Sequence, residues 1–104
     1  MTTQAATVIP NAAELEGKLH RHQDGGIYRF LFTSKHTEDL AELVNYEHIW
    51  PFAAGAKWSR PAQEWAGRFT QITEADLIDA QQVDRATAQA AIAQAKEARR
   101  AAAK

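Results

Sequence analysis

All nine aromatic residues and all four histidines of this 104-residue chain lie between His20 and Phe69, and the other 54 residues contain neither. Aromatic rings supply most of the core of a small domain, and imidazoles titrate near neutral pH. We therefore expect both the core and any site within this block. The absence of cysteine excludes disulfides, thiolate nucleophiles and cysteine-based zinc sites. The net charge of −1 argues against general nucleic-acid binding, which depends on counterion release.

Five short strands are expected inside the block, at residues 19–23, 27–34, 43–50, 57–60 and 68–72. The run Asp24-Gly25-Gly26 is a strong hairpin signal between the first two. Period-2 alternation puts Tyr28, Phe30 and Phe32 on one face of the second strand. In the third strand, the residues that share a face are Val44, Tyr46, His48 and Trp50. Short strands with frequent turn signals favour a small SH3-like barrel or a strongly bent antiparallel sheet.

Two flanks enclose this β-rich domain of residues 18–73. Residues 1–17 are expected to form an N-terminal arm with a short helix, because Asn11 and Glu14 have capping-box spacing. Residues 74–104 are alanine-rich and lack Gly and Pro, which predicts a C-terminal helix with a recapping break at Asp84. The chain has neither a secretory signal nor an apolar run of ~18 residues, so a cytoplasmic, non-membrane protein is the default expectation.

Several residues could carry chemistry. His20 and His22 project from the same face of a strand, as metal ligands can, but no fixed-spacing ligand set accompanies them. We therefore predict neither a metal site nor a cofactor. His36 and Glu38 are candidates for acid–base chemistry, although Thr37 as a cap followed by a first-turn acid explains the same triplet without chemistry.

Trp58 and Arg60 project to one side of a short strand that Pro61 closes. A flat π surface beside a planar cation can hold a base, a phosphate or a carboxylate. In the competing interpretation, Trp58 belongs to the core and Arg60 pairs with Glu38 or Glu64.

Three sequence blocks agree in order and spacing with a known family. They are HRHQDGGIY at residues 20–28, SKHTEDLAELVNY at residues 34–46, and WSRP at residues 58–61, followed by Trp65. Over residues 18–70 the chain resembles the bacterial and phage family catalogued as domain of unknown function 1653. The family pattern has an aromatic, a lysine and an apolar residue where this chain has His20, Asp24 and Glu64. His20 at an aromatic position weakens the hypothesis that His20 and His22 bind a metal. The loss of the lysine at Asp24 weakens the hypothesis of an anion site at the first turn.

The resemblance implies a small β-rich domain of a bacterium or its virus and brings no established activity. It makes the matched positions candidates for a shared site or a shared structural network. These positions are His22, His36, Glu38, Tyr46, Trp58 and Arg60.

The sequence thus favours a non-enzymatic binding module for a nucleotide-like or other small anionic or aromatic ligand. Tyr46 and Trp58 would stack on the ligand, Arg60 would pair with its charge, and His22 and His36 would form hydrogen bonds with it. A phage or bacterial accessory role in sequestration or host defence is compatible with the resemblance.

Two other classes of function stay open. In the first, Trp50, Phe52 and Trp65 are exposed and hold a partner peptide, and the alanine-rich helix docks or forms a homodimer. In the second, the protein is a small hydrolase that uses His36 and Glu38.

Overall fold

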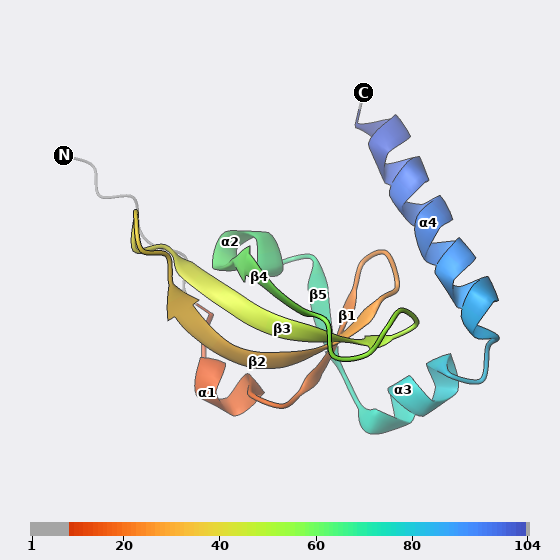
Figure 1. Ribbon diagram of the computed structural model, residues 1–104, viewed down its shortest axis with the longest axis horizontal. Coiled ribbons are helices and arrows are strands. Elements are labelled where there is room, and N and C mark those ends of the chain that lie inside the picture. The colour runs from red at the N-terminus through yellow and green to blue at the C-terminus, as the bar shows by residue number, and fades with distance from the viewer. Residues whose placement is uncertain (1–8, 104) are drawn as a thin grey trace.

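The computed structural model describes residues 9–103. Its centre is a five-stranded antiparallel sheet with the strand order β4-β3-β2-β1-β5 (Figure 1). The strands are β1 (Leu19–His22), β2 (Ile27–Lys35), β3 (Glu42–Trp50), β4 (Lys57–Pro61) and β5 (Phe69–Ile72). The helices are α1 (Ala12–Leu15), α2 (Ala62–Trp65), α3 (Glu74–Ala80) and α4 (Arg85–Ala102). A mainly β protein with a C-terminal helix is therefore confirmed, and each strand begins and ends within one residue of its expected bounds.

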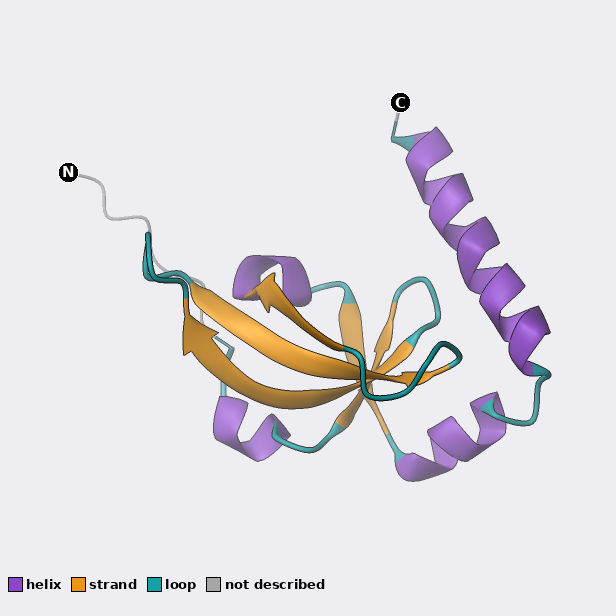
Figure 2. Cartoon of the chain, viewed as in Figure 1, coloured by secondary structure: helices purple, strands orange, loops and turns teal. Residues whose placement is uncertain are grey.

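The sheet does not close into a barrel. Within residues 9–103, β4 and β5 form its two edges and do not pair with each other (Figure 2). The single turn of α2, which the sequence did not reveal, joins these two strands and packs against β3 and β4. The expected SH3-like barrel is thus not formed, and the antiparallel-sheet alternative is the one that agrees with the structure.

A register shift in β2 decides which aromatic side chains reach the main core. Phe30 lies opposite Tyr46, but Phe32 lies opposite Asn45, with the shift between them. An extra residue in one strand sends the following side chains to the other face. Phe30 is fully buried, whereas Phe32 is 51% exposed. The expectation that Phe30 and Phe32 share a face is therefore wrong.

Each face of the sheet has its own apolar cluster. The main core comprises Ile9, Phe30, Val44, Tyr46, Ala62 and Trp65, and α1 contributes Ala12 and Leu15. The second core, on the opposite face, joins Leu19 and Ile27 to Leu77 of α3. A second register shift places Trp50 opposite Ile27, so Trp50 packs in this second core instead of sharing a face with His48.

The helix-start signals of the C-terminal region are confirmed. Thr73 and Asp76 form a reciprocal capping box at the start of α3, and Asp84 accepts a hydrogen bond from the Thr87 N–H at the start of α4. At α1, by contrast, Asn11 adopts a left-handed conformation with φ of 56° and makes no side-chain cap, so the expected capping box is not formed. Residues 1–8 of the expected N-terminal arm lie outside the described residues.

Helix α4 extends beyond the edge of the sheet domain (Figure 1). Ile92 is its buried residue, and the Gln89 side-chain amide donates a 2.9 Å hydrogen bond to the Pro51 carbonyl oxygen. Among residues 9–103, no helix has the length and apolar character needed to cross a membrane.

Candidate functional site: an aromatic–basic face

Six side chains gather on the face of the sheet that carries the main core, and all five strands contribute. They are His22 of β1, Tyr28 of β2, Tyr46 and His48 of β3, Arg60 of β4 and Phe69 of β5. Strand register brings them together, because His22 pairs with Phe69 and Tyr28 pairs with His48 across neighbouring strands. We call this group the aromatic–basic face.

Tyr28 is the centre of the ring contacts on this face. Its ring centroid lies 4.7 Å from that of His48, 5.2 Å from Tyr46 and 5.7 Å from Phe69, each in an edge-to-face arrangement. A Cβ at Gly26 would lie 3.1 Å from the Tyr28 ring, so the β1–β2 turn passes this close because it has a glycine there. The rings pack against one another, and this packing fixes the positions of the polar groups that they carry or contact.

Arg60 contacts two of these aromatic side chains. Its Nε donates a 3.2 Å hydrogen bond to the Tyr46 hydroxyl, and its guanidinium carbon lies 5.6 Å from the centre of the Phe69 ring. Its Nη1 lies 3.7 Å from the carboxylate of the half-exposed Glu64. The alternative pairing with Glu38 is not seen. The guanidinium is thus positioned by a ring and a hydroxyl, and its ion-pair partner is at the surface.

The tautomer of neutral His22 is fixed by the β1–β2 turn. The Asp24 backbone N–H donates a 3.0 Å hydrogen bond to Nδ1, so the ring proton must be on Nε2. Burial lowers the pKa of His22 from its ordinary value. The Asp24 carboxylate raises this pKa, while the positive charges of Arg60, Arg99 and Lys96 lower it. His22 is therefore a neutral hydrogen-bond donor, and both a neighbouring carboxylate and three cations act on it.

Asp24 is the unusual member of this neighbourhood. Its side chain is only 5% exposed, and Oδ2 has no hydrogen-bond partner among the described residues. Arg99 of α4 brings Nη1 to 2.9 Å from Oδ2, but its N–H is not aligned for a hydrogen bond, so the contact is one of opposite charges. A buried carboxylate of this kind is costly unless it is fully paired.

The other two buried histidines also have lowered pKa values. Burial is the main cause for His20 and for His48, and the charge of Lys96 adds to it at His48. His48 Nε2 accepts a 2.9 Å hydrogen bond from the Phe52 N–H, and His20 Nδ1 lies 3.3 Å from the Lys18 carbonyl oxygen. Within residues 9–103, no group of three or more side chains could hold a metal ion.

These burial effects predict a pH-dependent stability. The unfolded chain binds more protons than the native state between the lowered pKa values of His20, His22 and His48 and their ordinary value of 6.5. The free energy of unfolding should therefore fall as the pH drops through 6.5. Urea unfolding at about pH 7.5 and about pH 5 measures this difference. His48→Gln, which keeps an acceptor for the Phe52 N–H, should flatten the dependence, and a stability that is constant over this range would contradict the prediction.

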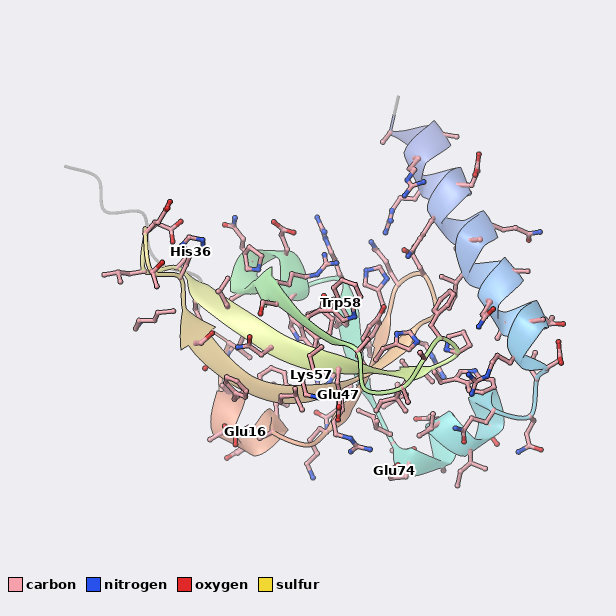
Figure 3. The ribbon with its side chains drawn as sticks, in the orientation of Figure 1. Glu16, His36, Glu47, Lys57, Trp58 and Glu74 are labelled. Atoms are coloured by element: carbon pink, nitrogen blue, oxygen red, sulfur yellow. The ribbon has the colours of Figure 1, made fainter. Side chains whose placement is uncertain are left out.

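The residues singled out from the sequence divide into two groups. His22, Tyr46 and Arg60 lie together, and Trp58 lies on the same side of the sheet, opposite Tyr46 in β3. Trp58 is 56% exposed, which excludes it from the core. Figure 3 shows His36 at the far end of the β2–β3 hairpin, well away from Trp58.

The β2–β3 hairpin does not bring His36 and Glu38 to the aromatic–basic face. His36 Nδ1 accepts a 3.1 Å hydrogen bond from the Glu38 backbone N–H, which leaves Nδ1 without a proton in the neutral ring. Asp39 accepts a hydrogen bond from the Ala41 N–H within the turn, so Asp39, and not Thr37, stabilises its backbone. Both His36 and Glu38 are exposed.

Of the three aromatic residues expected to be exposed, Trp50, Phe52 and Trp65, only Phe52 is exposed. Trp65 is buried in the main core, with its ring stacked 3.8 Å from Phe69, and Trp50 packs against the second core. The expectation that Trp65 is exposed is wrong, because α2 turns its ring inward.

An apolar pocket of about 250 Å³ lies where α4 meets the β1–β2 turn and the end of β3. Trp50 and Pro51 line one side, and Val83, Ala88 and Ile92 line the other. The guanidinium carbon of Arg85 lies over the Trp50 ring, 5.1 Å from its centre. This pocket marks where α4 docks, and the cations of the aromatic–basic face are not part of its lining.

Sequence reasoning missed Asp24, Tyr28, His48 and Phe69 as members of the site. Period-2 alternation carried a signal for His48, since it placed His48 on a face with the recognised candidate Tyr46. It placed Tyr28 only with Phe30 and Phe32, which were not site candidates. Nothing in the sequence signals the contact of Arg99 with Asp24, because the two residues are far apart in the chain and no repeating pattern connects them.

A family model described as "Protein of unknown function (DUF1653)" matches residues 18–76. The chain belongs to this family. The DUF1653 match runs from before β1 to the start of α3, so every strand of the aromatic–basic face lies inside the DUF1653 domain, and α4 lies outside it. No curated protein and no solved structure matches the chain.

Proposed function

We propose that this DUF1653 protein is a binding module, not an enzyme, and that its ligand is a small anionic aromatic molecule of the nucleotide type. The convergence of five strands on His22 and Arg60 carries the proposal. An oriented guanidinium and an imidazole N–H are both suited to an anion, and three cations, Arg60, Arg99 and Lys96, act on His22 against the one carboxylate of Asp24.

Trp58 supports the aromatic part of the proposed ligand. It lies two residues before Arg60 in β4 and opposite the Tyr46 position, and its ring is largely exposed. A planar base could stack on this ring while its anionic group reaches Arg60. Tyr46 is buried, so we assign it the role of orienting Arg60 and not of stacking on the ligand.

The hydrogen bonds of the histidines favour binding over acid–base catalysis. At His22 and His48 one ring nitrogen accepts a backbone N–H, which leaves the other nitrogen protonated in the neutral ring. A general base needs a free lone pair directed at the substrate. His22 offers a proton donor instead, which suits an anion that is held and not transformed.

Titration of the full chain with a nucleoside monophosphate, the matching nucleoside and inorganic phosphate tests this proposal. We expect the nucleotide to bind more tightly than either fragment. Trp58→Phe should weaken nucleotide binding by about threefold to tenfold, the effect of losing part of one stacking contact, with little change for phosphate. Phe32→Leu, at an exposed ring on the other face of the sheet, is the matched control.

Two results would overturn the proposal. One is the lack of any nucleotide binding at millimolar concentration when the protein is folded. The other is an equal effect of the Trp58 and Phe32 substitutions on nucleotide binding, which would show that the nucleotide does not bind at the aromatic–basic face.

A further inference from the structure

We propose that α4 supplies part of the anion site. The Asp24 carboxylate holds Arg99 in position, and a phosphate group of the ligand would replace Asp24 as the partner of Arg99. This inference rests on the proposed function, because it adds residues of α4 to the same site. It names the ligand class more closely as a phosphate monoester, and it gives the segment outside the DUF1653 match a role in recognition.

The geometry of the contact between Arg99 and Asp24 allows Arg99 to exchange the carboxylate for another anion. The carboxylate is buried and close to Nη1, at 2.9 Å, yet Oδ2 makes no aligned hydrogen bond. The Arg99 side chain is 44% exposed, so its remaining donors face solvent. A phosphate oxygen can therefore approach the guanidinium from the open side.

Charge around the pair favours a phosphate over the single carboxylate. Arg99 is joined by Lys96 one turn earlier on α4 and by Arg60 on β4, and the positive charges of all three act on His22. Against them stand Asp24 and, at the surface, Glu64. A phosphate monoester carries roughly −1.5 to −2 charges and three acceptor oxygens, so it matches several cations better than one carboxylate does.

Helix α4 is attached in a way that allows this role. Ile92 and Gln89 fix its N-terminal half to the β1–β2 turn and to Pro51. Lys96 and Arg99 lie one and two turns beyond Ile92, where Asp24 is the contact that ties the helix to the sheet domain. The docked half of α4 thus places Arg99 against Asp24, whose Oδ2 also lies 3.4 Å from His22 Nδ1.

Binding of inorganic phosphate to the full chain, at fixed ionic strength and followed by calorimetry or NMR, tests the inference through two opposite effects. Arg99→Ala should weaken phosphate binding by about tenfold, the effect of losing one charge-assisted hydrogen bond. Asp24→Asn should strengthen it by about threefold or more, because a competing negative charge is removed while the shape is kept. Arg100→Ala, the same change at the neighbouring exposed position of α4, should stay within about twofold of wild type.

The opposing explanation is that the Arg99–Asp24 pair only fastens α4. In that case Asp24→Asn and Arg99→Ala would alter phosphate binding in the same direction, or not at all, and the inference would be wrong. Equal effects of Arg99→Ala and Arg100→Ala would also overturn it. If Trp58→Phe still weakens nucleotide binding while the α4 variants do not weaken phosphate binding, the proposed function survives and only the role of α4 fails.

Discussion

Phe30→Ala should lower the free energy of unfolding by about 3–5 kcal/mol, the loss typical of removing a fully buried ring. Phe30 is 0% exposed and lies at the centre of the main core, where its ring contacts Trp65 and His20. A domain of this size has only about 5–15 kcal/mol of total stability, so this one substitution removes a large share of it. Chemical denaturation followed by circular dichroism measures the change.

Phe32→Ala is the matched control for this prediction. The register shift turns Phe32 to the other face, where it is half exposed, so its truncation should cost less than about 1 kcal/mol. If Phe30→Ala proves too unstable to purify, Phe30→Leu should still cost about 1–2 kcal/mol. Equal losses for the alanine variants at positions 30 and 32 would show that the two rings share a face after all.

Arg60→Ala should weaken binding of a nucleoside monophosphate by about 1.5–3 kcal/mol, which is roughly tenfold to 150-fold, and should leave the fold nearly intact. The mild effect on stability follows from its partners. The hydrogen bond to the Tyr46 hydroxyl contributes about 1 kcal/mol, and the ion pair with half-exposed Glu64 contributes at most about 1 kcal/mol. A stranded buried carboxylate would instead cost about 3–5 kcal/mol.

Arg68→Ala is the control for Arg60. Arg68 also pairs with Glu64, at 3.9 Å, but it takes no part in the aromatic–basic face. The two variants therefore change the net charge by the same amount, and each removes a partner of the Glu64 carboxylate. Loss of several kcal/mol of stability in Arg60→Ala, with binding unchanged in the folded fraction, would assign Arg60 to the scaffold. Equal losses of affinity in both variants would point to general electrostatics.

Local signals were sufficient for the five strands and for the two C-terminal helices, but not for α2. The alternation of Ile27–Lys35 and Glu42–Trp50, the Asp24-Gly25-Gly26 turn, and the caps at Thr73 and Asp84 each depend on residues close in the chain. Such signals locate an element and its ends. They do not say how the sheet ends at its edges, and for that reason an open sheet and a closed barrel both fitted the sequence.

The candidate site was predictable only in part. His22, Tyr46 and Arg60 were found, because the family resemblance marked them and the strands carrying them were recognised. The family resemblance marked His36 and Glu38 too, yet both lie in the turn between β2 and β3. Figure 3 shows His36 at that far end of the hairpin. A pattern match ranks residues by type and spacing, and it carries no information on which strand ends meet in space.

The sequence by itself determined where the strands and the C-terminal helices lie, and it concentrated the aromatic core in one block, because periodicity, turns and caps are local physical effects. Tertiary structure alone decided the faces. A register shift reversed Phe32, a turn of helix buried Trp65, and α4 placed Arg99 beside the buried carboxylate of Asp24. Each of these outcomes depends on packing between segments distant in the chain, where the free energy of burial and of charge pairing outweighs local preference.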